Sequence, residues 1–342
     1  MAGGGVVLVT GISRDLGRRA ARYIAGQPGV EKVIGVDVVP PRGDIGDVSF
    51  VRADIRTPVI AKVLAKEDVD TVVHMSVIAT PGRVGGRNTM KELNVIGTMQ
   101  LLAACQKSAS VKHLVVKSTG TFYGASSRDP AMFTEDMQPR SVPRAGYAKD
   151  VYEVEGYVRG FARRRPDVGI TLLRCANVIG AHVESPMTSY FRLPVIPTVF
   201  GFDPRLQFLH EDDLMRVLVH SVQSGAHGTF NVAGDGTLML SQAIRRMGRV
   251  DMPMPGPAVG GLGTALKKAR MADFSPEQIA YLTFGRGIDT TKMRDELGFE
   301  PDYTTAEAFA EFANSVAPAA RPADRVIGGL ASGLQAAGVR RG

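Results

Sequence analysis

Apolar runs alternate with helical patterns along most of the chain. The run at 6–10 is apolar throughout and ends at a glycine, as expected for a strand buried on both faces of a parallel sheet. A helical pattern at 15–25 follows it. Further strands are predicted at 32–37, 48–52, 69–74, 114–117, 169–174 and 229–232, and helices at 60–66, 90–107, 146–163, 214–222 and 241–248. This alternation predicts an α/β protein with a doubly wound parallel sheet.

Beyond residue 180 the pattern becomes irregular and rich in Pro, Met and Gly, which suits a small lobe laid on the strand ends. We therefore expect a Rossmann-type domain at 1–178, to which later segments return, and a mainly substrate-binding lobe at 179–315. The stretch 252–257 is a candidate linker or lid. We expect a flexible tail at 316–342, with a weak amphipathic helix at 325–337 as the alternative.

Composition narrows the possible ligands and partners. The chain has 342 residues and a net charge of +7, with its basic residues scattered along the sequence. This charge suits an anionic ligand such as a nucleotide, and no motif for nucleic-acid binding accompanies it. Cys105 and Cys175 fall in apolar stretches and are expected to be core residues. No signal peptide or run of transmembrane length is evident, so a cytoplasmic protein is expected.

The turn at 11–17 is a candidate dinucleotide site, because it follows the first strand and opens the first helix. There the helix N-terminus and backbone N–H groups can meet a diphosphate. Arg14 replaces the usual middle glycine and could clash with the diphosphate or contact it. Asp37, at the end of the second strand, can accept the ribose hydroxyls, which favours NAD over NADP. The candidate contacts in the turn are Gly11, Ser13, Arg14, Asp15, Leu16 and Gly17. The alternative is a turn that merely needs glycine.

Several segments, in order, resemble those of the extended short-chain dehydrogenase/reductases, in particular the NAD-dependent nucleotide-sugar epimerases and dehydratases. The resemblance covers about residues 5 to 300 and includes Ser-Thr-Gly-Thr-Phe-Tyr-Gly at 118–124 and Arg-Cys-Ala-Asn-Val-Ile-Gly at 174–180. The other matching segments are 51–56, 69–76, 94–98, 144–149, 207–213, 228–232 and 297–301.

The resemblance implies roles for individual residues. It makes Thr119 and Lys149 catalytic: the first hydrogen-bonds the reacting oxygen, and the second orients the nicotinamide ribose of the cofactor. It implies further cofactor contacts at Asp54, Ile55, Met75, Ser76 and Asn94. It implies substrate contacts at Tyr123, Asn177 and Arg205.

The segment 144–149 departs from the family pattern, because Ala145 stands where the family has its acid/base tyrosine. Tyr147 precedes Lys149 by two residues and should point to the opposite side of a helix, so it is expected to be a poor substitute. Tyr152 shares the face of Lys149 but lies one turn further along. The missing phenol matters because acid/base catalysis contributes about 10²–10⁴-fold.

The leading hypothesis is an NAD-dependent enzyme that transiently oxidises a nucleotide sugar, similar to UDP-sugar 4-epimerases. The first alternative is a non-catalytic NAD-binding protein with a regulatory role, which Ala145 and Arg14 favour. The second is a reductase similar to 3β-hydroxysteroid dehydrogenases, with an apolar substrate. The family resemblance also implies a homodimer through the helices at 90–107 and 146–163.

Overall fold

A sheet of seven parallel strands forms the centre of the molecule. The computed structural model describes residues 5–79, 85–256, 258 and 275–316. The sheet has the order β11-β6-β5-β4-β1-β2-β3, and all of its strand pairs are parallel. The strands are β1 (Val6–Thr10), β2 (Lys32–Asp37), β3 (Val48–Arg52), β4 (Thr71–His74), β5 (His113–Thr119), β6 (Gly169–Cys175) and β11 (Gly228–Val232). The predicted doubly wound sheet is confirmed.

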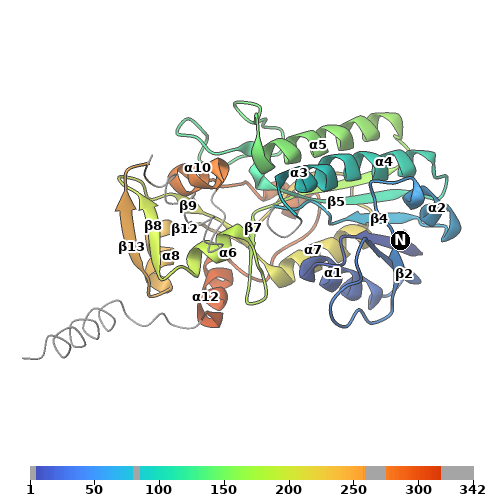
Figure 1. The fold of residues 1–342 in the computed structure, drawn as a ribbon, viewed down its shortest axis with the longest axis horizontal. Helices are drawn as coiled ribbons and strands as arrows, with labels where there is room; N and C mark the ends of the chain where they lie inside the picture. The colour runs from blue at the N-terminus through green and yellow to red at the C-terminus, as the bar shows by residue number, and fades with distance from the viewer. Residues whose placement is uncertain (1–4, 80–84, 257, 259–274, 317–342) are drawn as a thin grey trace, which may run out of the picture.

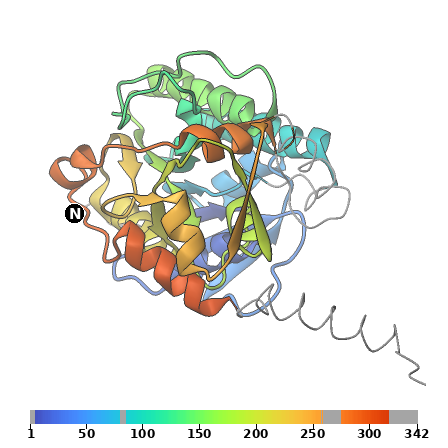
Figure 2. The ribbon, with the colours of Figure 1, turned by 90° about the vertical axis from the view of Figure 1, so that its left-hand side faces the viewer.

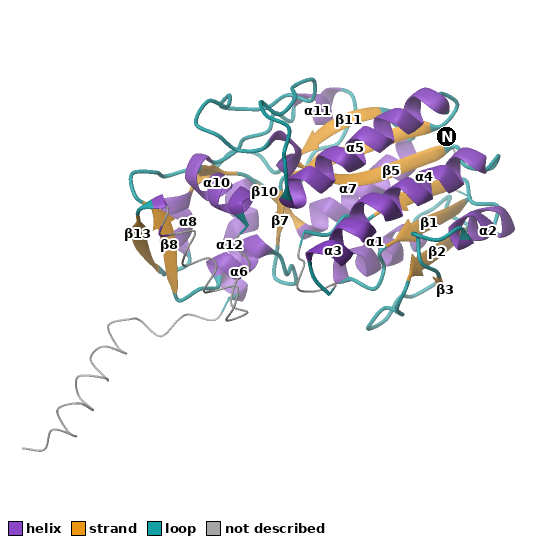
Figure 3. Cartoon of the chain, turned by 45° about the horizontal axis from the view of Figure 1, so that its top comes forward, coloured by secondary structure: helices purple, strands orange, loops and turns teal. Residues whose placement is uncertain are grey.

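Helices cover both faces of the sheet (Figures 1 and 3). One face packs against α2 (Val59–Lys66), α4 (Gly97–Lys107) and α5 (Gly146–Arg164), and the other against α1 (Asp15–Ala25) and α7 (Glu211–Ser224). In β1, Leu8 packs with the first group of helices, whereas Val7 and Val9 pack with the second. Burial on both faces explains why this strand is apolar without alternation.

The strand order reverses between β1 and β4, because the chain builds outward from β1 in one direction and then crosses to the other side. In an open α/β sheet such a reversal leaves a crevice outside the carboxyl ends of the strands, where ligands bind. The crevice lies beside the turn that follows β1, which is the candidate dinucleotide site.

The helix predicted at 90–107 is interrupted near its start. The structure has α3 (Arg87–Lys91), a π-helical stretch η2 (Glu92–Ile96) and then α4. Within η2, the Asn94 side chain accepts a hydrogen bond from the Ile78 N–H at 2.7 Å and donates to the Ile78 carbonyl at 2.9 Å. Asn94 thus fixes the segment that follows β4. Hydrophobic periodicity could not predict this contact, because it joins residues that are far apart in the sequence.

A second, smaller group of elements forms a lobe at one end of the molecule (Figure 1), and this lobe faces the viewer in Figure 2. Four phenylalanines, Phe191, Phe208, Phe309 and Phe312, are fully buried and form much of its core. The lobe contains α6 (Pro186–Phe191), β8 (Val195–Val199), β9 (Arg205–Leu206), β12 (Leu238–Met239), α8 (Leu240–Arg246), β13 (Val250–Met254), α10 (Pro276–Phe284) and α12 (Thr305–Ser315). The short strands β7 (Asn177–Ile179) and β10 (Phe208–His210) pair where the chain enters and leaves this lobe.

The C-terminal half differs from its prediction at one segment. The interpretation of 252–257 as a linker or lid is wrong for 252–254, because these residues belong to β13, which pairs in parallel with β8. Backbone pairing with a distant strand overrides the local signal of the prolines. The predicted tail beyond residue 316 and its alternative helix at 325–337 lie outside the described residues. Among the described residues, no helix is both long and apolar enough to cross a membrane.

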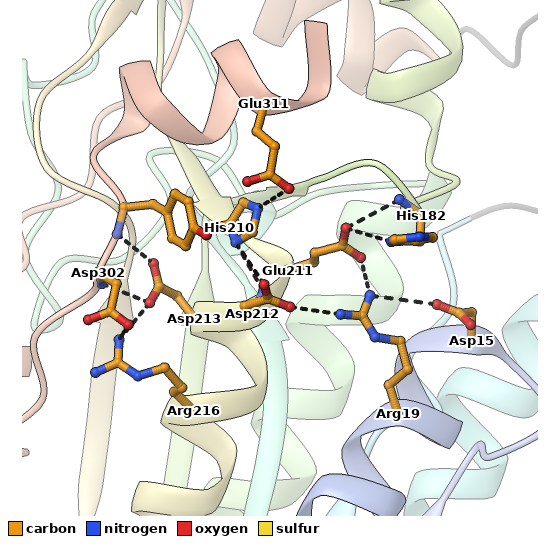
Figure 4. Close-up of polar contacts among 11 residues, drawn as sticks. Asp15, Arg19, His182, His210, Glu211, Asp212, Asp213, Arg216, Asp302 and Glu311 are labelled. Carbon is orange, nitrogen blue, oxygen red and sulfur yellow. Dashed lines mark hydrogen bonds and ion pairs between the residues drawn. The ribbon is translucent and has the colours of Figure 1, made fainter. Parts of the chain in front are cut away.

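Ion pairs join the first helix to the start of α7 (Figure 4). Arg19 of α1 contacts Glu211 and, at 2.8 Å, Asp212, both at the start of α7. Glu211 in turn accepts hydrogen bonds from the backbone N–H of His182 and meets its ring at 3.2 Å. Glu211 is 3% exposed, so removing Arg19 would leave a buried carboxylate without its cation.

The neighbouring His210 caps α7 and is fully buried. Its Nδ1 accepts the Asp212 N–H at 3.2 Å, so a neutral ring carries its proton on Nε2, which faces Glu311 Oε1 at 3.3 Å. A metal ligand needs a lone pair on that nitrogen. We therefore regard His210, Glu211 and Glu311 as part of the group of hydrogen-bonded and ion-paired side chains at the start of α7, and not as a metal centre.

The aromatic core of the lobe gives the first prediction. Phe309 packs its ring against Phe191 and Phe208, with centroids 4.9 and 5.5 Å away. Phe309→Ala should lower the free energy of unfolding by about 3–5 kcal/mol, because it leaves a cavity. The control Phe200→Ala, at a side chain 73% exposed, should change it by less than about 0.5 kcal/mol. Urea unfolding measures both, and equal effects would contradict the packing described.

Candidate functional site

The turn after β1 is built on two glycines. Gly11 has φ +80°, and a Cβ there would lie 2.9 Å from the Ser76 hydroxyl oxygen. A Cβ on Gly17 would lie 2.2 Å from the Gly11 carbonyl oxygen, which no side chain tolerates. The first turn of α1 therefore packs directly on the turn, and its N-terminus faces the crevice, as anion binding requires.

Asp37 is fixed at the end of β2 beside this turn. Its Oδ2 accepts the Ser13 hydroxyl at 2.6 Å and the Ser13 N–H at 3.0 Å, and its Oδ1 accepts the Val38 N–H at 2.7 Å. The carboxylate is only partly buried. It is held in place by protein donors and keeps further lone pairs, as a group that accepts hydroxyls must.

The end of β4 lies next to Gly11. The His74 ring bonds Thr10 and Thr98, each at 2.8 Å, and the Met75 N–H donates to the Thr10 hydroxyl at 3.1 Å. Burial, together with the smaller effect of the charge of Arg14, lowers the pKa of His74 to about 4. His74 is therefore neutral at pH 7 and braces the strand ends. Met75 and Ser76 are buried beside the crevice, where their cofactor roles stay predictions.

The segment at 54–55 lies on the far side of β2. Asp54 pairs with Arg56 at 2.7 Å, and the side-chain hydrogen bond from Arg56 lowers the pKa of Asp54. Ile55 is buried against Gly97.

Two further predicted cofactor contacts lie in the first turn of α1. Asp15 is 43% exposed and pairs with Arg18 at 2.6 Å, and Leu16 packs against the core. All four of these contacts with the cofactor stay predictions, as does that of the fully buried Asn94.

The structure brings Thr119 and Asn177 together in a pocket at the carboxyl ends of β5 and β6. Thr119 pairs in register with Cys175, and Asn177 follows two residues later. The pocket lining comes from four parts of the chain: Thr119, Gly120, Thr121, Cys175, Ala176, Asn177, Gln207, Tyr281, Arg286 and Ile288. The cavity measures about 10 Å³, room for one water molecule, so a sugar would require side chains to move.

Sequence reasoning missed the residues that reach this pocket from the C-terminal segment. Arg286 donates to the Gly120 carbonyl, and its guanidinium lies 5.0 Å from the centre of the Tyr281 ring. Burial lowers the pKa of Arg286 without neutralising it, so the pocket contains a fixed positive charge. In the sequence, only the position of this arginine between two glycines, at 285–287, could have pointed to a role in the pocket.

Two predicted substrate residues, Tyr123 and Arg205, do not line this pocket. Tyr123 is 1% exposed, donates to Asn231 at 2.7 Å and accepts from Arg174 at 2.8 Å. Its ring packs in the core between the sheet and α5, so its prediction as a wall of the substrate site is corrected. The short helix η3 (Gly120–Tyr123) turns it inward. Arg205 is exposed in β9, and its substrate contact stays a prediction.

The predicted catalytic lysine is not brought to the pocket. Lys149 is 37% exposed, and its Nζ lies 3.6 Å from Glu153 on the next turn of α5. Ala145, in the position of the family tyrosine, is exposed and caps α5. The cofactor role of Lys149 stays a prediction.

A larger cavity of about 540 Å³ lies between α5 and β11, around Val158 and Leu172. None of the predicted site residues lines this cavity.

Comparison with known proteins identifies this architecture. Residues 7–233 match the sequence model of the NAD dependent epimerase/dehydratase family. The chain belongs to this family. An uncharacterized protein of Mycobacterium tuberculosis is 48% identical over 311 residues, which cover 90% of this chain and 83% of that one. NAD is the cofactor of the family, and the prediction of an extended short-chain dehydrogenase/reductase is confirmed.

Solved structures share the fold. UDP-glucose 4-epimerase from Thermotoga maritima, crystallised with UDP-glucose, superimposes with a TM-score of 0.69 at 18% identity, covering 91% of this chain and 98% of that one. dTDP-glucose 4,6-dehydratase from Bacillus anthracis, in complex with NAD, gives 0.67 at 19% identity, with 91% and 96% covered. At these identities the likeness establishes the fold alone.

The residues of the crevice fit NAD. Because Gly17 has no side chain, the first turn of α1 packs on Gly11, and the N–H groups at the start of the helix can meet a diphosphate. Asp37 is positioned to receive ribose hydroxyls, and its charge disfavours a 2′-phosphate. These residues bind and orient, whereas NAD, when bound, supplies the redox chemistry.

Replacing Gly17 tests this fit. Gly17→Ala should abolish the rise in melting temperature that NAD produces, because the new Cβ forces α1 away from the turn. Ligand binding to the folded state normally raises stability by RT ln(1 + [L]/Kd). The control is Gly26→Ala, at the end of α1, where the nearest atom would be 3.8 Å away. NAD should still stabilise that variant. A full NAD response in Gly17→Ala would contradict the site, as would stabilisation by NADP alone in the wild type.

Proposed function

We propose that this chain is an oxidoreductase similar to the epimerases and dehydratases, which transiently oxidises a nucleotide sugar in the manner of a UDP-sugar 4-epimerase. The observation that carries the proposal is the shared pocket of Thr119, Asn177 and Arg286, at the same sheet edge as the cofactor crevice. The family supplies NAD. A sugar bound in the pocket would thus lie next to the cofactor.

The chemistry of the lining supports this substrate class. The positive charge of Arg286 suits the diphosphate of a nucleotide sugar. Asn177 and Gln207 offer amide groups to sugar hydroxyls, and the Thr119 hydroxyl can hydrogen-bond the reacting oxygen. A polar lining of this kind does not favour the apolar substrate of a steroid reductase.

A non-catalytic NAD-binding protein is the second candidate, because Ala145 leaves no phenol at the family position. Both candidates share the cofactor crevice and differ in whether a bound sugar is oxidised. We also propose the division of the chain near residue 178 and a homodimer through α4 and α5, on the basis of the family resemblance.

Thr119 gives a direct test of catalysis. The readout is reduction of bound NAD after addition of UDP-glucose, UDP-glucuronic acid or dTDP-glucose, followed by absorbance. Thr119→Val should slow it at least about tenfold, the equivalent of one lost hydrogen bond of about 1.4 kcal/mol. Thr119→Ser keeps the hydroxyl and should retain most of the rate. Equal rates in both variants would remove Thr119 from the mechanism.

Restoring a tyrosine separates the two candidates. If the chain is an enzyme as it stands, the wild type reduces bound NAD with one of these sugars, and Ala145→Tyr changes the rate by less than about tenfold. An inactive wild type that gains activity in Ala145→Tyr would instead support the non-catalytic protein. The same absorbance assay decides between them.

A further inference from the structure

The cavity between α5 and β11 has the size of a ligand site and shares no lining residue with the pocket that contains Thr119. Its volume of about 540 Å³ falls within the range of about 300–1,000 Å³ that is usual for sites of small organic molecules. One wall is a stripe on α5, in which Glu155, Val158, Arg159 and Ala162 follow one another at spacings of three, one and three residues.

The floor of the cavity is the face of the sheet on which α5 packs. Ile170 and Leu172 of β6 share this face because they are alternate residues of one strand, and Leu172 belongs with Val158 to the core cluster under α5. Leu173 lies in the cluster on the opposite face, with the residues of α7. Thr229 extends the floor onto the edge strand β11. The middle of the cavity is therefore mainly apolar.

The cavity runs along the strands. His227 and Gly228 line it at the amino end of β11, whereas Arg174 lines it one residue before the carboxyl end of β6. Because β6 and β11 are parallel, these residues mark opposite ends of the cavity. Its shape thus suits an elongated molecule that passes over Leu172.

The two carboxylates that line the cavity differ in their partners. Glu155 is 1% exposed and pairs with Arg174 at 2.9 Å and with Arg159 at 3.6 Å. Glu135 lies at the same end, where its carbonyl accepts a hydrogen bond from Arg174 at 3.0 Å. The Glu135 carboxylate accepts the Asn231 N–H at 2.8 Å but forms no ion pair with another described residue.

The surroundings of the Glu135 carboxylate leave its charge incompletely stabilised. Burial raises the pKa of Glu135, and the N–H of Asn231 and the charge of Lys292 offset that rise only in part. Lys292 itself pairs with Glu296 at 3.6 Å. A cation in direct contact would stabilise the carboxylate, and the open side of Glu135 faces the cavity. The cavity is therefore complementary to a positive charge at this end.

The wall that carries Glu155 is fixed without a ligand. Glu155 accepts the Ser118 hydroxyl at 2.6 Å, so it is tied to β5 as well as to Arg174. Arg174 also donates to the Tyr123 hydroxyl at 2.8 Å, and its guanidinium lies 3.8 Å from the centre of the Phe122 ring. Side chains held in this way are already ordered, which lowers the entropic cost of binding a ligand beside them.

We propose that this cavity is a second ligand site, which binds an elongated organic amine. The apolar body of the amine lies over Leu172 and Val158, and its ammonium group donates a charge-assisted hydrogen bond to the Glu135 carboxylate. The lining is separate from that of the nucleotide-sugar pocket, so the inference goes beyond the proposed function and does not depend on it.

The test compares octylamine, octanol and octanoic acid, which share one apolar body and differ in charge. Isothermal titration calorimetry with the full chain at neutral pH measures the dissociation constant of each. The amine should bind most tightly and the acid most weakly. Glu135→Gln keeps the shape and removes the charge, so it should weaken amine binding at least about tenfold and leave octanol binding unchanged.

The matched control is Asp136→Asn, because Asp136 is the next residue, is exposed and does not line the cavity. It removes the same charge and should leave the amine affinity unchanged. Ala162→Phe fixes the location of binding, because it puts a ring into the cavity from α5 and should abolish binding of both the amine and octanol. Saturating NAD should not change the amine affinity, since the cofactor crevice lies elsewhere.

Every outcome bears on the site. Tighter binding of the acid than of the amine overturns the assignment, as does an equal loss of amine affinity in Glu135→Gln and Asp136→Asn. Amine binding that survives in Ala162→Phe, or that NAD abolishes, places the amine elsewhere. No binding of any of the three compounds at millimolar concentration also overturns the inference. None of these results affects the proposed function, and a failure of every nucleotide sugar to react leaves the amine site standing.

Discussion

The parallel direction of the seven strands is the constraint on which the rest of the structure depends. Because all strands run the same way, their carboxyl ends meet at one edge, and the reversal of order between β1 and β4 opens a crevice there. The close contact between Gly11 and Gly17 leaves the N-terminus of the first helix open to a cofactor. The residues at and just after the ends of β4, β5 and β6 lie at the same edge, although they come from well-separated parts of the sequence.

The charges inside the molecule are sorted by position. Buried acids under α5 are paired with arginines: Asp150 with Arg87, and Glu155 with Arg174 at 2.9 Å. Beside the crevice and pocket stand cations, Arg14 and Arg286. Their positive charges suit a diphosphate, which NAD carries and which the proposed nucleotide sugar would carry too.

The two parts of the molecule are interleaved along the sequence. After the lobe begins, α7 and β11 return to cover and extend the central sheet, and the chain leaves again for α8. The ion pairs from Arg19 to Glu211 and Asp212 fasten the cofactor helix to the start of α7. The segment that carries Tyr281 and Arg286 closes over Thr119 from the other side. The pocket therefore consists of residues whose mutual distance is set by how these parts pack.

The sequence by itself determined the features that depend on neighbouring residues. Continuous apolar runs specified the buried parallel strands, the spacing of Gly11 and Gly17 specified the turn, and the resemblance to family motifs pointed to Thr119 and Asn177. Tertiary structure decided the rest, because helix orientation and long-range pairing are not local properties. It paired the proline-containing 252–254 with a distant strand, buried Tyr123 against Arg174, and delivered Arg286 to the pocket. It also turned α5 so that Tyr147 packs on the buried cluster around Val151 and Val154, whereas Lys149 pairs with Glu153 and is partly exposed.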